Sequence, residues 1–280
     1  MASKTWNVDS LQVKRGTSDK WNSQNPILKA GEIGYDSTNN LFKIGNGTSN
    51  WKNLPHFAPK TLDAYSWAEI STIAKSGNTS SFFKVGDEKN ITLSTGEMVT
   101  LIILGFDHDT KTAGGTAGIT FGMKNLLATT YPMNSSNTNS GGWTSSVMRT
   151  STMATLLSQL PSDLQSVIKP VNKLTSAGAQ STTINTDSDS LFLLSEVEVS
   201  GGTTYSVAGE GTQYAYYRDI ANTNTLKIKK LSNGTGSAGN WWLRSPFASS
   251  STSFCYVSRN GNAKHYNASN SWGVAFGFCI

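Results

Sequence analysis

Two stretches near the end of the sequence show the clearest strand pattern, Asn240-Trp241-Trp242-Leu243-Arg244-Ser245-Pro246 and Gly273-Val274-Ala275-Phe276-Gly277-Phe278-Cys279-Ile280. Apolar side chains alternate or run together in both, as they do in the strands of a buried sheet. The segment between them, residues 247–272, is mostly Ser, Asn, Thr and Ala with isolated aromatic and basic residues, and it contains no acidic residue. Within it, residues 254–257 predict a further strand. The sequence therefore indicates a buried sheet with unusually polar connections.

Short polar side chains with scattered aromatic rings are typical of a recognition surface, because Tyr and Trp give contact area at a low entropy cost while Ser and Asn adapt to a partner. We predict that residues 247–272 display such a surface on a scaffold that includes Val257, Gly261, Ala263 and Gly273. The alternative is a polar surface loop without a ligand. The candidate binding positions are Phe247, Ser249, Ser250, Ser253, Tyr256, Ser258, Arg259, Lys264, His265, Tyr266, Asn267, Ser269, Asn270 and Trp272.

Residues 66–194 predict a mixture of helices and strands. Ser66 can cap a helix over residues 67–75, with Glu69 at the capping-box position and Gly77 as its terminator. Strands are expected over residues 91–93, 98–104 and 192–194. Apolar residues at helical spacing predict one helix over residues 143–159 and a second over residues 162–168. This mixture predicts an α+β fold.

The order of motifs across about residues 62–280 is specific. Gly-Phe-Asp-His-Asp (105–109), Gly-Ile-Thr-Phe-Gly (118–122), Met-Asn (133–134), Gly-Gly-Trp (141–143) and Met-Arg (148–149) precede the two C-terminal stretches. Together they resemble a bacterial and phage domain family of C-type-lectin-like fold, nearest to the branch related to formylglycine-generating enzymes. The resemblance implies a short helical pair on a twisted antiparallel sheet, with the two ends of the domain paired near each other. Residues 247–272 also resemble the variable region of diversity-generating retroelement proteins, which implies that randomised Asn codons diversify the candidate positions.

The first part of the chain, residues 1–57, contains short strand-like runs at residues 11–15, 31–35 and 41–44. Turn-forming residues between the last two predict a hairpin over residues 33–44. So few apolar positions make a poor core in isolation, and self-association is the usual remedy. Pro59 interrupts the pattern, so we expect a linker at residues 58–64 and a second domain over residues 65–280.

The first part also shows an ordered set of motifs. They are Gln-Val-Lys-Arg-Gly-Thr (12–17), Trp21, Asn-Pro (25–26), Gly-Glu-Ile-Gly (31–34), Lys-Ile-Gly-Asn-Gly (43–47), Trp51 and Leu-Pro (54–55). This order resembles a small module at the N-termini of phage tail-fibre and tropism-determinant proteins. The resemblance implies a β-rich, β-prism-like element that attaches to the phage tail and forms trimers.

The charge pattern argues against a nucleic-acid partner. The formal net charge is +5. Residues 1–60 hold eight Lys or Arg and four Asp or Glu, which accounts for +4 and leaves the rest of the chain near neutral without a basic stripe. No apolar run approaches the length of a membrane span, and residues 1–6 lack the apolar core of a secretory signal. We therefore expect a protein made in a host cytoplasm, without membrane insertion, that reaches a virion.

No group of residues predicts catalysis, a cofactor or a metal site. His56, His108 and His265 occur in separate contexts without zinc-ligand spacing. The best metal candidate is Asp107-His108-Asp109, but it offers too few oxygen ligands for calcium, and such a cluster more often caps a turn or forms a local salt bridge. The Glu-Pro-Asn, Gln-Pro-Asp and Trp-Asn-Asp motifs of calcium-dependent sugar lectins are absent from the C-terminal domain. A glycan ligand that binds without calcium therefore remains an alternative.

Cys255 and Cys279 raise the possibility of an oxidase, because enzymes of the formylglycine-generating branch use a cysteine pair near the C-terminus. Both fall in predicted strands, where they are expected to be inert small hydrophobes, and two cysteines do not form a disulfide framework. Arg244 is expected to clamp the base of the polar segment, and Trp241 and Trp242 are expected in the core.

These observations lead to one functional prediction. We expect a non-enzymatic receptor-binding protein of phage tail-fibre type whose variable surface binds a bacterial cell-surface receptor, either protein or glycan. Other phage tail proteins and two further copies of the chain, in a homotrimer, are the expected partners. The alternatives are an enzyme of the formylglycine-generating fold and a purely structural virion protein.

Overall fold

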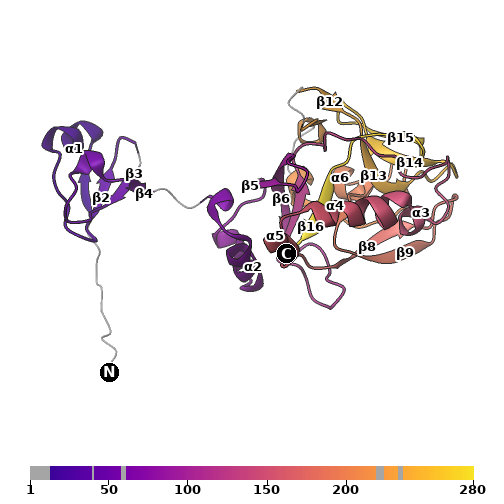
Figure 1. Cartoon of the computed structure of the whole chain (residues 1–280), viewed down its shortest axis with the longest axis horizontal. Coiled ribbons are helices and arrows are strands. Elements are labelled where there is room, and N and C mark those ends of the chain that lie inside the picture. The colour runs from indigo at the N-terminus through magenta and orange to yellow at the C-terminus, as the bar shows by residue number, and fades with distance from the viewer. Residues whose placement is uncertain (1–12, 40, 58–60, 219–223, 233–235) are drawn as a thin grey trace. The chain divides into compact units, whose positions relative to one another are not determined.

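The buried hydrophobic side chains of the described residues gather into two cores. The computed structural model describes residues 13–39, 41–57, 61–218, 224–232 and 236–280. It divides into two units, Met1–Lys60 and Thr61–Ile280 (Figure 1). The division falls inside the predicted linker 58–64, of which residues 58–60, with Pro59, lie outside the described residues.

The first unit is a four-stranded sheet with one helix, α1 (Ser18–Gln24). Its strands lie in the order β1-β2-β3-β4, with β1 parallel to β2 and the other pairs antiparallel. The strands are β1 (Lys14–Gly16), β2 (Ile33–Asp36), β3 (Leu41–Ile44) and β4 (His56–Phe57). Ile33 pairs with Ile44, which confirms the predicted hairpin. Of the strand predicted over residues 11–15, residues 11 and 12 lie outside the described residues.

Two stacked tryptophans form most of the first core. The rings of Trp21 and Trp51 lie 4.0 Å apart at 12°. They pack on Gly34 of β2, where an added Cβ would lie 2.6 Å from the Trp51 ring. Only glycine fits this close approach. Lys43 of β3 is buried on the same face and donates from Nζ to the Trp51 carbonyl at 2.8 Å. One face of the sheet is therefore covered.

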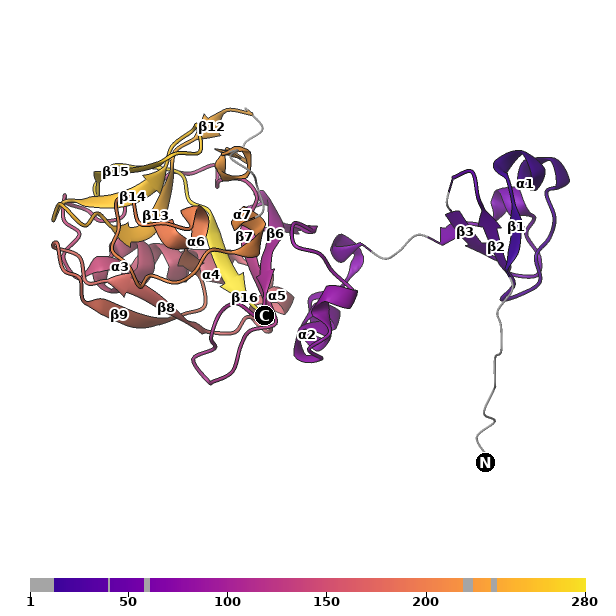
Figure 2. The same cartoon turned by 180° about the vertical axis from the view of Figure 1, so that it is seen from behind.

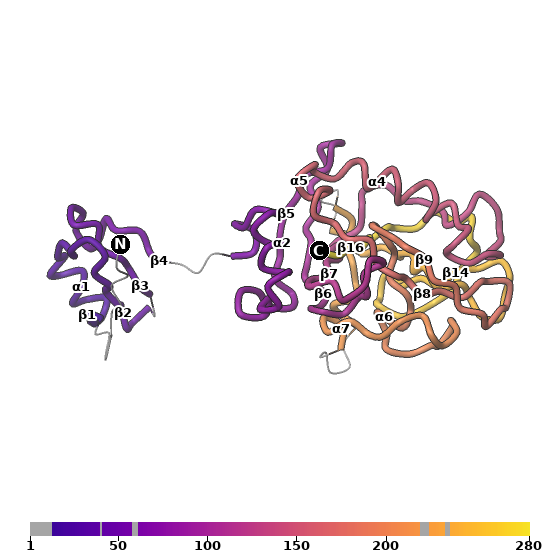
Figure 3. The backbone as a smooth tube through the Cα atoms, turned by 90° about the horizontal axis from the view of Figure 1, so that it is seen from below, coloured from indigo at the N-terminus to yellow at the C-terminus, as the bar shows by residue number. Residues whose placement is uncertain are grey.

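The second unit is organised around a five-stranded antiparallel sheet in the order β10-β16-β7-β6-β5. The strands are β5 (Glu88–Thr92), β6 (Met98–Phe106), β7 (Ile119–Met123), β10 (Phe192–Leu193) and β16 (Phe276–Cys279). Figure 3 shows β16 beside β7 and β6, although they are far apart in sequence. β5 lies at one edge, and β6 and β7 separate it from β16. The first and last strands of the unit therefore do not pair, and the pairing of the domain ends implied by the resemblance is wrong.

Helix α2 (Trp67–Lys75) packs on this sheet. Ser66 and Glu69 form the predicted capping box, which satisfies main-chain N–H groups at the helix start. The Trp67 ring meets Phe121 of β7 edge-on at 5.5 Å and Phe278 of β16 at 6.1 Å. An aromatic cluster thus fixes the helix over the centre of the sheet.

The single helix predicted over residues 143–159 is interrupted. The structure has α3 (Gly142–Ser145), then a π-helical turn (Met148–Thr152) that continues into α4 (Met153–Gln159). Ser146 breaks the helix because its backbone is extended, at ψ 144°, and its Oγ accepts from the Arg149 N–H like an N-cap. The second predicted helix is α5 (Ser162–Gln165), shorter than the predicted range 162–168.

Three smaller sheets complete the second unit. They pair β8 (Val171–Ser176) with β9 (Ile184–Asp189), β11 (Lys229–Lys230) with β12 (Ala238–Gly239), and β13 (Trp241–Pro246) with β14 (Ser253–Val257) and β15 (Ala263–Asn267). Two short helices, α6 (Glu196–Ser200) and α7 (Ala215–Arg218), lie among them. Figure 2 shows β13, β14 and β15 side by side, with α6 next to β13. Helices combined with several small, mainly antiparallel sheets confirm the α+β prediction.

Candidate functional site

The predicted binding residues gather on the antiparallel sheet β13-β14-β15 and its connecting turns. β13 is buried along its whole length, whereas the edge strand β15 is largely exposed. Tyr256 of β14 lies opposite Lys264 of β15, and Cys255 lies opposite His265. Successive side chains of a strand point to opposite faces. The structure therefore divides the predicted residues between two faces of one sheet.

The first face holds a cluster of three half-exposed aromatic rings, which we call the Trp272 cluster: Tyr256, Tyr266 and Trp272. The Trp272 ring lies 5.8 Å from Tyr256 and 5.7 Å from Tyr266. Beneath them, the buried Trp242 ring lies 6.5 Å from Trp272. The Trp272 main chain exchanges two hydrogen bonds with Tyr131, whose carbonyl also accepts from Trp242 Nε1 at 2.9 Å. The cluster is therefore fixed from below while Tyr266 stays 47% exposed.

The second face holds a different aromatic group. Phe247 stacks on His265 with centroids 3.7 Å apart at 15°, and Tyr205 approaches His265 at 5.1 Å. Tyr205 is held by its N–H, which donates to the Glu196 carboxylate, and by its carbonyl, which accepts from the Ala248 N–H at 2.8 Å. The predicted residues on this face are thus packed against a side chain from outside the predicted segment.

The remaining predicted residues lie in turns at the ends of the sheet. The Arg259 N–H donates to Asn240 Oδ1 at 2.9 Å, so its turn is tied to the residue before β13. Ser269 donates from Oγ to Asn137 Oδ1 at 2.6 Å. Ser258 and Asn270 are half-buried, and Ser249 is exposed. These turns flank the two aromatic groups with hydroxyl and amide groups.

Ser253 departs from the prediction because it is buried, at 5% exposure. It pairs with the exposed Asn267, and its hydroxyl lies 3.4 Å from Asn267 Oδ1. Its carbonyl and that of Ser250 accept from Nδ2 of the fully buried Asn139. Ser253 therefore belongs to the frame and not to the displayed surface.

A buried charged group fixes the first strand of this sheet. Arg244 of β13 is completely buried and binds Glu198 of α6 through two hydrogen bonds of 2.5 and 2.8 Å. It also donates to the carbonyls of Leu174, Leu193 and Glu210. One guanidinium thus links β13 to β8, β10, α6 and the segment before α7, which supports the predicted role of Arg244 as a clamp.

The same group continues through Lys173 of β8. Its ammonium donates to Glu198 at 2.6 Å, to Asp109 at 2.7 Å and to the Tyr214 hydroxyl at 3.1 Å. Burial alone would raise the pKa of Asp109, but the charge of Lys173 and hydrogen bonds, including one from Thr120, hold it well below its usual value. Burial likewise opposes ionisation of Glu198, and the charges of Arg244 and Lys173 still lower its pKa. These carboxylates are ionised parts of the frame.

The candidate metal cluster has structural contacts instead of an open ligand set. His108 Nδ1 lies 3.5 Å from Asp109 Oδ2, while Asp109 also binds Lys173. Asp107 is exposed, with its backbone in the left-handed region at φ 48°. Within the described ranges, no three His, Cys, Asp or Glu side chains are grouped so that they could hold a metal ion. The ion pair of Asp109 joins it to the distant Lys173 of β8, which gives this carboxylate a structural role.

Both cysteines lie in strands, as predicted. Cys255 of β14 and Cys279 of β16 are buried and unpaired. Burial raises the pKa of both thiols well above the usual value, and nearby carboxylates add to the effect. The thiolate is the reactive form of cysteine, so both side chains are held in the unreactive form.

Comparison with known proteins identifies the second unit by its sequence family. The sequence profile of a family described as a domain of unknown function (DUF6273) matches residues 117–280. This chain belongs to that family. The DUF6273 match begins just before β7 and includes the whole of the sheet β13-β14-β15. No curated protein matches the chain, and no solved structure matches it either.

A second profile, the major tropism determinant N-terminal domain, matches residues 11–49. This range holds β1, α1, β2 and β3 and ends before Trp51 and β4. The match supports a protein of phage tropism-determinant type, and such a domain implies a component of the virion. Within the described part of the chain, no helix combines the length and apolar character needed to cross a membrane.

Sequence reasoning missed several residues that shape the site in the DUF6273 domain. Tyr205 joins the second aromatic face, Tyr131 holds the Trp272 cluster, and Asn137 and Asn139 hold the turns. Each comes from a polar loop that is distant in sequence from β14. Only the neighbouring Met-Asn and Gly-Gly-Trp motifs hinted that residues 131–143 belong with the C-terminal strands.

Proposed function

We propose that this chain is a phage receptor-binding protein whose sheet β13-β14-β15 contacts a molecule on the bacterial surface. The match to a tropism-determinant N-terminal domain supports the general class. The Trp272 cluster is the observation that supports this location: three aromatic rings stay accessible at a sheet edge while Trp242 and Tyr131 fix them from below. Rings held in place bind a partner with little further loss of entropy.

The side chains around the Trp272 cluster suit a surface that binds neutral or acidic ligands. Arg259 and Lys264 are the lysine and arginine side chains of residues 247–272, the turns add Ser and Asn side chains, and that range has no carboxylate side chain. The C-type-lectin-like architecture and the diversification of these positions are parts of the proposal. They are supported by motif order and by the scaffold that Arg244 and Asn139 provide for variable side chains.

We also propose that the first unit joins three copies of the chain and attaches them to other tail proteins. The support is the uncovered face of its sheet. Phe42 and Phe57 are cross-strand neighbours that are 39% and 59% exposed, and Ile44 is 40% exposed on the same face. A unit this small gains stability when such a face is buried by association.

The binding experiment uses the full chain and a panel of bacterial cells. We expect selective binding by the natural protein, and a loss of at least tenfold in affinity for Tyr266→Ala combined with Lys264→Ala, because both side chains are exposed on the cluster face. Phe82→Ala, which removes a 50% exposed ring elsewhere in the unit, is the matched control. Equal binding by both variants and the natural protein would assign the sheet a structural role.

The enzyme alternative has its own test. We propose that the cysteines have no catalytic part, since both thiols are buried in the unreactive form. Cys255→Ser and Cys279→Ser variants that remain folded are expected to bind cells as the natural protein does. Loss of function in a folded variant would favour an enzyme of the formylglycine-generating fold.

A further inference from the structure

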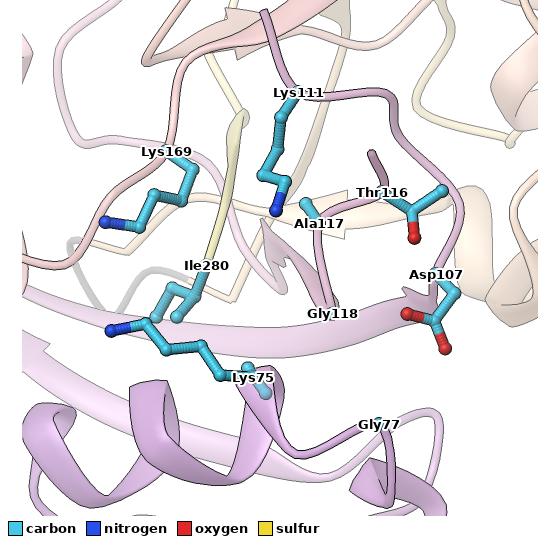
Figure 4. A pocket seen from close by; sticks show the side chains of 10 residues that line it. Lys75, Gly77, Asp107, Lys111, Thr116, Ala117, Gly118, Lys169 and Ile280 are labelled. Atoms are coloured by element: carbon cyan, nitrogen blue, oxygen red, sulfur yellow. The ribbon is translucent and has the colours of Figure 1, made fainter. Parts of the chain in front are cut away.

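A pocket of about 310 Å³ opens in the second unit, away from the sheet β13-β14-β15. Its walls come from the end of α2, from the segment that leads from β6 to β7, and from Lys169 and Ile280 (Figure 4). It is the size of pockets that hold small ligands. None of its residues belongs to the proposed receptor site.

Three lysines line this pocket: Lys75, Lys111 and Lys169. Figure 4 shows Lys75 and Lys169 extending past Ile280 to the same side, with the Lys111 ammonium near Ala117. Lys111 and Lys169 are half-buried, yet among the described residues none of the three ammonium groups has a hydrogen-bond or ion-pair partner. A second hollow of about 310 Å³ shares Lys111 and Lys169. Unpaired cations that line one hollow attract an anion, because an anion relieves their mutual repulsion.

The other end of the pocket has the opposite character. Asp107 and Thr116 line it there (Figure 4). A carboxylate accepts hydrogen bonds, and a hydroxyl can both accept and donate. The pocket therefore offers Lys75 and Lys169 at one end and hydrogen-bond acceptors at the other, with Lys111 between them (Figure 4).

The walls are fixed before any ligand arrives. Gly118 touches the end of α2 so closely that an added Cβ would lie 2.3 Å from the Ala74 carbonyl. Ile280 exchanges two main-chain hydrogen bonds with Ile119, and the Lys169 N–H donates to the Cys279 carbonyl at 2.9 Å. A preformed pocket loses little free energy through reorganisation on binding.

We propose that this pocket binds a small ligand with an anionic group at one end and hydroxyl groups at the other, such as a sugar acid or a sugar phosphate. The lysines hold the carboxylate or phosphate as point charges. Asp107 accepts hydrogen bonds from the hydroxyl groups of the sugar. The pocket shares no residue with the sheet surface β13-β14-β15.

Calorimetric titration of the full chain tests this site with glucuronic acid, glucose 6-phosphate and neutral glucose. We expect both acidic sugars to bind with an affinity that falls as salt rises, and glucose not to bind. Lys111→Gln combined with Lys169→Gln should weaken binding of the acidic sugars at least tenfold. Lys84→Gln combined with Lys124→Gln, which removes the same charge from the exposed surface, should leave it unchanged.

Asp107→Asn tests the other end of the pocket. It should weaken the binding of both acidic sugars more than the binding of inorganic phosphate. Circular dichroism checks that each variant is folded. No binding by either acidic sugar, equal binding by the Lys111/Lys169 variant, or equal binding by glucose would each overturn the proposal. Because the probes are small soluble molecules, none of these outcomes bears on attachment to cells.

Discussion

Glu210 is a fully buried carboxyl group beside the clamp on Arg244. Burial raises its pKa to about 7, although the Ser176 N–H donates to it at 2.8 Å. In the unfolded chain the same group titrates near its ordinary value of 4.5. The folded protein therefore holds this proton more tightly than the unfolded chain does.

The stability of the natural protein should fall as pH rises from about 5 to 7, because the folded state must then give up the Glu210 proton. The full effect is on the order of 3 kcal/mol, from a pKa difference of roughly two and a half. Glu210→Gln should reduce this slope in urea unfolding followed across the pH range. Glu88→Gln, at an exposed position on β5, is the control and should keep the natural slope. A Glu210→Gln variant with the natural slope would show that Glu210 is not the titrating group.

Other buried groups act in different pH ranges. Burial lowers the pKa of Lys229 to about 7, so its contribution to stability grows between about pH 7 and its ordinary value of 10.5. Asp109 and Glu198, whose pKa values are lowered, lose their stabilising effect only in acid below the Glu210 range. Burial also raises the pKa of Asp189, which acts in the same direction as Glu210. The difference between the natural protein and Glu210→Gln therefore isolates the Glu210 part of the slope.

At the scale of elements, Arg244 ties β13 to three neighbouring elements. Arg244 binds groups from β8, β10 and α6, so its loss leaves Glu198 with Lys173 as its only cationic partner among the described residues. Arg244→Met should lower the free energy of unfolding by roughly 3–5 kcal/mol, because a buried carboxylate loses its main partner. Arg259→Met, in an exposed turn, is the matched control. Equal melting temperatures for the two variants would show that the clamp contributes little.

Elements with strong local signals could be predicted from the sequence. The hairpin over residues 33–44 formed as expected, and Ser66 with Glu69 capped α2 as expected, since turn and cap chemistry act over a few residues. The helix predicted over residues 143–159 broke at Ser146, where a side-chain hydrogen bond outweighed helical periodicity. Local pattern fixes an element best where no distant contact competes.

The composition of the candidate site was predictable from the sequence, but its geometry was not. The polar and aromatic character of residues 247–272 indicated a surface, and most of the candidate residues lie at the surface or half-buried. The division between two faces depends on the register of β14 with β15, and the place of Tyr205 depends on its bonds to Glu196. Both come from tertiary contacts that a linear pattern does not encode. The lysine pocket was missed for the same reason.

At the scale of the whole molecule, one chain holds two compact units, for which we propose different tasks. Weak contacts at each sheet β13-β14-β15 gain strength when several copies are joined, because later contacts form at a high effective concentration. Avidity of this kind raises apparent affinity by about 10²–10⁴ without any new contact. The first unit has a suitable face for this purpose in Phe42, Ile44 and Phe57.

The natural protein should therefore run in light scattering at three times its chain mass of 30.0 kDa. Phe42→Glu combined with Phe57→Glu should give monomers, since a charge in an apolar interface is strongly disfavoured. Met98→Glu, at a 65% exposed apolar position on β5, should remain trimeric. Cell attachment by the monomeric variant should weaken at least a hundredfold while its single-site affinity stays unchanged. A natural protein that is monomeric at micromolar concentration would contradict the trimer and leave receptor binding to a single sheet.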